Sequence, residues 1–245
     1  VAAHFVSDVP VALLFSGGTD SSLLAAMAKE QGRDPLAFHL AIDGNKDNEY
    51  ATEIANKLKL QVHPLVMTTE HVVEAYQRMS EHLDIPIANP SYIPTSIIYQ
   101  QITGKSKVVL SGEGGDELFG GYARHAALQS QRQLRKKNPL LLALLQSGYG
   151  QREWSMHFGN PILRRLIEWY QSAGDDVLGV YAIQTRNLDY PLAAKQNRER
   201  MYELLTEKPA SAGLAPDRYL YLPHDLLLKN DYASMVASVE ARVPL

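Results

Sequence analysis

Continuously apolar segments alternate with segments of helical periodicity through the first half of the chain, and this order restricts the fold more than any other feature. The apolar segments have the length and composition of buried strands and lie at 11–15, 35–42, 61–67 and 107–111. The helical segments lie at 21–31, 47–59 and 69–83. Strands that are apolar throughout and alternate with helices are typical of a parallel sheet covered on both faces. We therefore expect an α/β fold.

Three finer predictions come from the same pattern. Pro64 lacks a backbone N–H, which favours an edge position or a bulge for the strand over 61–67. Pro94 stands where a further helix can begin. One face of the helix over 47–59 is apolar and contains Ala51, Ile54, Ala55 and Leu58.

After about residue 122 the strand pattern ends and helical segments follow. We expect two parts, an α/β core over 1–125 and a helical lobe over 126–245. Within the lobe, residues 231–243 are predicted to form a helix that ends before Pro244. The carboxyl ends of parallel strands are where such sheets bind ligands, so residues 14–20 and 110–116 are expected to share a site.

Composition excludes several classes of function. The 245 residues carry a formal net charge of −3 and contain no cysteine, which excludes disulfides, thiolate metal sites and cysteine nucleophiles. The 8 histidines show no metal-ligand spacing. The charge gives no case for a nucleic-acid partner, and no run of 18 apolar residues indicates a membrane segment. We expect a cytoplasmic protein.

The sequence SGGTDSS at 16–22 lies between the first strand and the first helix. Glycines in such a turn let successive backbone N–H groups point at one spot, and the start of the helix adds its own N–H groups and positive dipole end. This arrangement suits phosphate. The loop has no lysine for a Walker A motif and no G-x-G-x-x-G pattern. The alternative is a plain Ser or Asp helix cap after a glycine turn.

The same loop resembles the SGGxDS motif of the N-type ATP pyrophosphatases, the PP-loop superfamily. The resemblance implies that Asp20 holds Mg²⁺. It also implies that the β- and γ-phosphates of ATP are bound by Ser16, Gly17, Gly18, Thr19, Ser21 and Ser22. The physics agrees, because a carboxylate beside phosphate needs a divalent cation between the two.

Two further segments narrow the resemblance to the synthetase domain of the asparagine synthetase B family. They read VVLSGEGGDELFGGYARH at 108–125 and LLLKNDYASMVASVEARVP at 226–244. The resemblance implies that Glu113 acts in forming and consuming an acyl-adenylate, and that Asp116 is a second carboxylate for metal or pyrophosphate. It further implies nucleotide contacts for Phe15, Leu40, Ser111 and Gly112. Asp231, Glu240 and Arg242 are candidates for the acyl-acceptor side, with a structural Arg–Glu pair as the alternative.

The resemblance implies a ligase that uses ATP and Mg²⁺. Such an enzyme adenylates a carboxylate, with aspartate expected, and transfers the acyl group to ammonia with release of AMP and pyrophosphate. The alternatives are an intramolecular amide-forming cyclase of the β-lactam synthetase or lasso-peptide cyclase kind, and a nucleotide-binding fragment without turnover. The family's ammonia comes from a glutaminase domain that starts with a cysteine and is not in this chain. A homodimer remains open.

The end of the chain differs from the family pattern. It stops at VPL, where the family continues with Phe-Leu-Asp and further helices. We therefore expect the lobe to be truncated. A family lysine in an Arg-x-Lys-like segment, which contacts phosphate and the intermediate, is expected to lie beyond Leu245.

Overall fold

The computed structural model describes residues 1–41, 47–85, 87, 89–122, 125, 214 and 217–245. The chain divides into two compact units. The first contains Val1–Gly115 and Tyr221–Leu245, and the second contains Asp116–Leu220.

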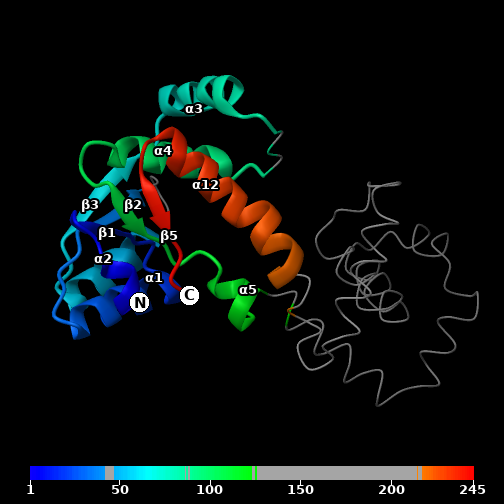
Figure 1. Cartoon of the computed structure of the whole chain (residues 1–245). Coiled ribbons are helices and arrows are strands. Elements are labelled where there is room, and N and C mark those ends of the chain that lie inside the picture. The colour runs from blue at the N-terminus through cyan, green and yellow to red at the C-terminus, as the bar shows by residue number, and fades with distance from the viewer. Residues whose placement is uncertain (42–46, 86, 88, 123–124, 126–213, 215–216) are drawn as a thin grey trace, which may run out of the picture. The chain divides into compact units, whose positions relative to one another are not determined.

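A five-stranded parallel sheet forms the centre of the first unit (Figure 1). Its strands are β1 (Val11–Leu14), β2 (Ala37–Ala41), β3 (Val62–Val66), β4 (Val108–Leu110) and β5 (Glu240–Arg242), in the order β3-β2-β1-β4-β5. Every neighbouring pair is parallel. The chain moves outward from β1 to β3 and then returns to the other side of β1, so the strand order reverses between β1 and β4. Ligands of parallel sheets bind at such a reversal.

One face of the sheet is covered by α1 (Thr19–Glu30), α2 (Asp47–Leu58) and the short 3-10 helix η1 (Ala2–Phe5). Leu13 and Leu110 of the sheet are fully buried in this cluster, against Leu24 of α1. The residues predicted for the apolar face of α2 lie here too, since all four belong to or pack against the same cluster. That prediction is confirmed.

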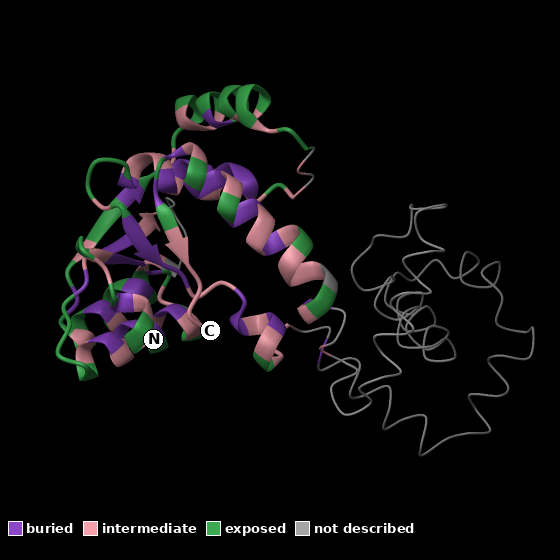
Figure 2. Cartoon of the chain, in the orientation of Figure 1, coloured by how far each residue is buried: buried purple, intermediate pink, exposed green. Residues whose placement is uncertain are grey.

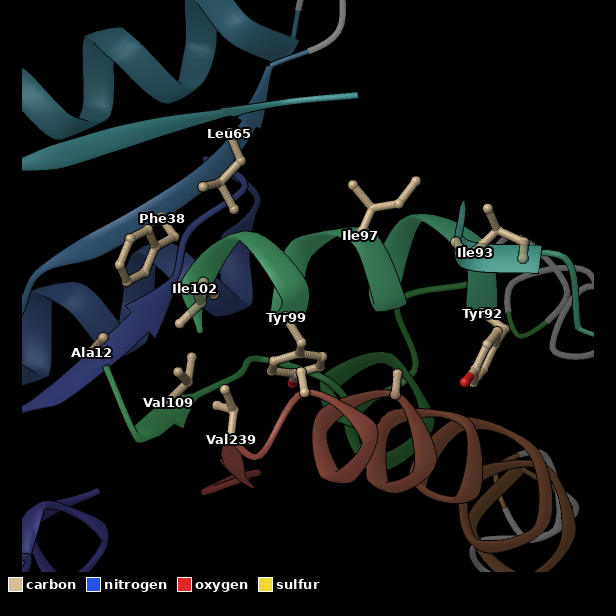
Figure 3. Packing of buried hydrophobic residues seen from close by; sticks show 13 residues of the cluster. Ala12, Phe38, Leu65, Tyr92, Ile93, Ile97, Tyr99, Ile102, Val109 and Val239 are labelled. Atoms are coloured by element: carbon tan, nitrogen blue, oxygen red, sulfur yellow. The ribbon is translucent and has the colours of Figure 1, made fainter. Parts of the chain in front are cut away.

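The other face is covered by α4 (Tyr92–Ile102) and α12 (Leu227–Val236), with α3 (Thr69–His82) packed on α4. Ala12 and Val109 alternate with the residues of the first face, as neighbours along a strand must. Figure 3 shows Tyr99 between α4 and α12, and Ile102 above the sheet. Most of α3 is exposed (Figure 2). Both faces are therefore covered, which confirms the predicted fold class of the sheet.

The prolines lie where the sequence predicts. Pro64 is in β3, which is the outermost strand of the sheet on its side, so its missing N–H leaves no inner pairing unfilled. Pro94 is in the first turn of α4, where the backbone N–H has no partner inside the helix. Both expectations are confirmed.

The helix predicted over 231–243 is wrong beyond its first half. α12 ends at Val236, Ser238 has a positive φ of 54°, and Glu240–Arg242 forms β5. The backbone of β5 completes the open edge of β4, with Glu240 N donating to Lys107 O over 2.8 Å. Val239, which precedes β5, is buried, and Glu240 is exposed. Pairing with a strand 132 residues earlier decides this segment.

In the second unit the structure describes α5 (Gly115–Phe119) and part of the π-helix η3 (Asp217–Leu226). Buried His125 contacts buried Asp217, and Tyr122 Oη donates to the buried carboxylate of Glu117. Most of the predicted helical lobe, residues 126–213, lies outside the described residues, so the division at residue 125 stays a prediction. None of the helices that the structure describes has both the length and the apolarity that crossing a bilayer requires.

Candidate active site

The loops that follow β1 and β4 flank the reversal of strand order, and the sheet fixes where each begins. Phe15 N donates to Phe38 O over 2.8 Å, and Ser111 N donates to Arg242 O over 2.9 Å. Both residues are buried, so the loops start from rigid backbone. The polar segments at 16–22 and 111–115 therefore leave the same edge of the sheet, as predicted.

The first loop passes very close to the start of α2. Gly17 has φ +78°, and a Cβ on it would lie 2.6 Å from the Cα of Ala51. Backbone atoms cannot approach a side chain so closely, so only glycine fits at this position. The loop conformation depends on Gly17 for both reasons.

No side chain caps α1. Its N-cap is Gly18, which has no side chain to bond the first N–H groups of the helix. The backbone of Gly18 instead bonds neighbouring side chains: its N–H donates to Ser16 Oγ over 3.2 Å, and its carbonyl accepts from Ser21 Oγ. The alternative interpretation of this loop as a Ser or Asp helix cap is therefore wrong. A helix start that follows a glycine turn and lacks a side-chain cap presents backbone N–H groups and a positive dipole end to an anion.

Ser21 braces the loop from inside. Its hydroxyl accepts from Ser16 N over 3.2 Å, lies 3.1 Å from Ser16 Oγ and donates to Gly18 O over 3.2 Å. Ser22 Oγ is buried and has no hydrogen-bond partner among the described residues. The direct structural role of Ser21 is thus to shape the loop, and its phosphate contact stays a prediction, as do those of Ser16, Thr19 and Ser22.

The second loop lies directly against Asp20. A Cβ on Gly112 would be 3.0 Å from Asp20 Cβ, and a Cβ on Gly115 would be 2.5 Å from Asp20 Cγ. The two glycines thus make room for the Asp20 side chain, and the two loops are in contact. Asp116 is the first residue of the second unit and lies in the first turn of α5. Its metal role stays a prediction.

Glu113 is held by a lysine that the sequence analysis did not assign. Lys229 Nζ lies 2.5 Å from Glu113 Oε1, and the two side chains are only 6% and 17% exposed. Glu113 N also donates to Ser111 Oγ over 3.2 Å. Lys229 shares the buried face of α12 with Asn230, Ala233 and Ser234. The sequence offered one sign of this contact: a lysine on a helix face whose other side chains are small. A lysine buried on such a face requires a partner of opposite charge.

Arg242 and Glu240 follow the structural alternative. Arg242 Nε bonds Glu240 Oε1 over 2.6 Å, and its Nη1 donates to His4 O and Val6 O over 2.8 Å each. These bonds fasten η1 to β5. Asp231 is exposed on α12. None of these observations supports an acyl-acceptor role for the three residues.

β2 contributes a histidine beside Phe15. His39 Nδ1 lies 2.9 Å from Phe15 O and Nε2 lies 3.0 Å from Asn48 Oδ1, so this ring links β1, β2 and α2. Leu40, the predicted nucleotide contact on β2, packs partly against the core cluster on the opposite face. Its contact with a nucleotide stays a prediction.

The Asp20 site suits a cation that is held mainly by phosphate. No cluster of three or more His, Cys, Asp or Glu residues that could hold a metal exists among the residues that the structure describes. Mg²⁺ in nucleotide sites uses one or two carboxylates and takes its other ligands from phosphates and water. A single carboxylate beside an uncapped helix start suits Mg²⁺ that takes its other ligands from phosphate and water. It does not suit a metal held by protein ligands alone.

Known proteins resemble this chain along its whole length. The family model described as asparagine synthase matches residues 1–245. Asparagine synthetase [glutamine-hydrolyzing] 1 of Bacillus subtilis is 28% identical over 260 residues, which cover 100% of this chain and 40% of that protein. Asparagine synthetase B [glutamine-hydrolyzing] of Escherichia coli is 32% identical over 142 residues, covering 50% and 25%.

A solved structure, the NH3-dependent NAD synthetase of Campylobacter jejuni, covers 71% of this chain and 89% of its own, at 15% identity and a TM-score of 0.35. That score is too low to support an inference. The chain also spans less than half the length of the two curated relatives. The match of the family model over all 245 residues is sufficient by itself: the chain belongs to the asparagine synthase family.

Proposed function

We propose that this chain is the ATP-dependent, amide-forming part of an asparagine synthetase. A carboxylate oxygen of the substrate, with aspartate as the expected acid, attacks the α-phosphorus of ATP, and pyrophosphate leaves. The nitrogen of ammonia then attacks the acyl carbon, and AMP leaves as the new C–N bond forms. One observation carries the proposal: an uncapped helix start, Asp20 and Glu113 lie on two loops in contact at the reversal of strand order.

The loop at 16–22 binds the β- and γ-phosphates in this proposal. Backbone N–H groups at the start of α1 supply a positive potential for these phosphates. Asp20, with Asp116 as the second expected ligand, holds Mg²⁺. When bound, Mg²⁺ compensates the charge of the triphosphate and of the leaving pyrophosphate. Phe15, Leu40, Ser111 and Gly112 are the proposed contacts of the nucleoside and the α-phosphate.

Glu113 is the proposed acid–base residue. It follows β4 closely, and its loop contacts the Asp20 loop, which supports a position beside the acyl-adenylate in this proposal. During attack on the acyl carbon it orients the incoming amine and accepts its proton. Positioning of the reactants supplies most of the acceleration.

The ammonia is proposed to come from a glutaminase domain outside these 245 residues. The names of both curated relatives include glutamine hydrolysis. An internal amine of the substrate, as in a cyclase, is the alternative acceptor, and a fragment that binds ATP without turnover is the other. Location in the cytoplasm and a homodimer stay predictions.

The test separates binding from chemistry in the full-length protein. Wild type is expected to convert aspartate, ammonia and Mg·ATP into asparagine, AMP and pyrophosphate. Glu113→Gln should keep the ATP affinity and lower amide formation by about a hundredfold to ten-thousandfold, the usual loss for one acid–base group. Glu117→Gln, in the neighbouring helix turn, is the matched control for loss of a carboxylate. If Glu113→Gln lowers both the melting temperature and the ATP affinity, Glu113 only braces its loop.

A further inference from the structure

The ion pair between Lys229 and Glu113 joins two segments far apart in the sequence. Lys229 is in the first turn of α12, and Glu113 is in the loop after β4. Their charged atoms are 2.5 Å apart and the lysine side chain is 6% exposed. Water therefore screens the pair little, and its geometry is tighter than that of a surface ion pair.

The loop of Glu113 fixes the backbone of that residue, because Glu113 N donates to Ser111 Oγ over 3.2 Å. Glu113 stands between Gly112 and Gly114, and Gly114 has φ +93°, a conformation that glycine adopts at little cost. The contact with Lys229 adds a constraint on the carboxylate itself.

α12 is anchored to α4 at the residue next to Lys229. Tyr99 Oη of α4 donates to Oδ1 of Asn230, the next residue after Lys229, over 2.7 Å, and both residues are buried. Burial raises the pKa of Tyr99, and the negative charge of Glu113 raises it further. A fixed lysine can hold a carboxylate at a fixed place, which a mobile surface lysine cannot.

Stability alone does not explain a buried pair of this kind. Replacing a buried ion pair by apolar residues is often neutral or stabilising, so such a pair is weak evidence for a stabilising role. Its geometric effect on the acid–base residue is a better explanation. The effect of the pair is then felt in the reaction more than in folding.

We propose that Lys229 is a positioning residue that holds the Glu113 carboxylate in place for the acyl-transfer step. This inference rests on the proposed function, because it assigns Lys229 a role only through Glu113. Lys229 contacts neither ATP nor the acyl group in this scheme. Its removal should leave adenylation intact and slow the attack by the amine.

The experiment uses the full-length protein and two readouts, ATP–pyrophosphate exchange and amide formation. Lys229→Met keeps the length of the side chain and removes its charge. We expect amide formation to fall by about a hundredfold, the scale of a small misplacement of a catalytic group, while exchange changes less than about threefold. Lys229→Arg should restore part of the lost rate, because it returns a cation to the same place. Lys57→Met, which breaks the exposed pair with Glu53, is the matched control and should change neither readout.

A double-mutant cycle tests whether Lys229 acts through Glu113. In the Glu113→Gln background, Lys229→Met should cost no further activity, because the group that it positions is already gone. Multiplicative losses in the double mutant would overturn the inference. Equal losses of exchange and amide formation in Lys229→Met would overturn it too.

Glu113→Asp covers the case in which Lys229→Met does not fold. It keeps the charge on both sides and withdraws the carboxylate by one methylene, so the same selective loss of amide formation is expected. Normal turnover in Glu113→Asp would contradict the inference. A loss in Glu113→Gln with none in Lys229→Met would contradict the inference alone, whereas absence of amide formation in wild type would contradict the proposed function.

Discussion

At the scale of single residues, the site depends on glycines at positions where a Cβ would collide with a neighbour. Gly17 lets the first loop pass the backbone of α2, and Gly112 and Gly115 let the second loop lie on Asp20. These are steric requirements of the tertiary contact and not of the local turn. Asp20 is the polar side chain that this contact encloses.

The first prediction concerns Asp20. Asp20→Asn should weaken binding of Mg·ATP by about tenfold or more, which corresponds to about 1.4 kcal/mol, and should change binding of ATP without Mg²⁺ much less. The reason is that the amide keeps the shape of the side chain and loses the charge that a cation needs. Titration of the protein with ATP, with and without Mg²⁺, measures both. Asp34→Asn, in an exposed carboxylate paired with Lys29, is the control. Unchanged Mg·ATP affinity in Asp20→Asn would remove Asp20 from the metal site.

The second prediction concerns Gly115. In Gly115→Ala the new methyl group would lie 2.5 Å from Asp20 Cγ, so the Asp20 side chain has to turn away. We expect weaker Mg·ATP binding and a loss of about 1–3 kcal/mol in the free energy of unfolding, the usual range for overpacking. Gly104→Ala is the control, because Gly104 has φ +81° and no neighbouring atom within 4 Å. It should lower stability through its backbone alone and leave binding unchanged. Equal Mg·ATP binding in both variants would contradict the packing argument.

At the scale of helices and strands, the segment after α12 shows how a sheet edge can override a helical pattern. The residues from 231 onward have helical spacing, yet the helix stops at Val236 and the chain enters β5 through Ser238. Ser238 is in the left-handed region, with φ 54°, which costs a non-glycine residue about 1–2 kcal/mol. The backbone hydrogen bonds of β5 to β4 offset that cost.

The third prediction follows from this turn. Ser238→Gly should raise the free energy of unfolding by up to about 1 kcal/mol, because glycine removes the left-handed strain. The greater conformational entropy of glycine in the unfolded chain offsets part of this gain. Ser80→Gly is the control, because Ser80 is exposed within α3 and glycine there should lower stability by about 0.5 kcal/mol. Chemical unfolding of the three proteins gives the values. A lower stability in Ser238→Gly would mean that the turn does not carry this strain.

At the scale of the whole molecule, the proposed acyl-activating site lies in a chain whose composition excludes thiol chemistry. The 245 residues contain no cysteine. The nearest chemical route from glutamine to ammonia in this family needs a cysteine nucleophile. In the proposed function, the ammonia is therefore made outside these 245 residues.

The fourth prediction tests that dependence. The purified 245-residue chain incubated with glutamine should release no glutamate above the uncatalysed background, with or without ATP. Free ammonia is the control nitrogen source for any amide formation. Release of glutamate by a pure sample would show a thiol-independent glutaminase in this chain and would overturn the prediction.

The parallel sheet, its two covered faces and the two polar loops were predictable from the sequence. Local patterns suffice for these features, because a buried strand, an amphipathic helix and a glycine turn each have a period or composition that is visible over a few residues. Pro64 at the edge and the apolar face of α2 were predictable for the same reason. The three segments that resemble the asparagine synthetase B family also indicate the family from sequence alone.

Only the tertiary structure decided β5, the fit of Gly112 and Gly115 over Asp20, and the partner of Glu113. Each depends on atoms more than 90 residues apart in the chain, so no local period reports it. Lys229 is the clearest case. In the sequence it is one lysine in a helical segment, and its role is visible only once α12 has packed on α4 and brought its ammonium to the carboxylate of Glu113.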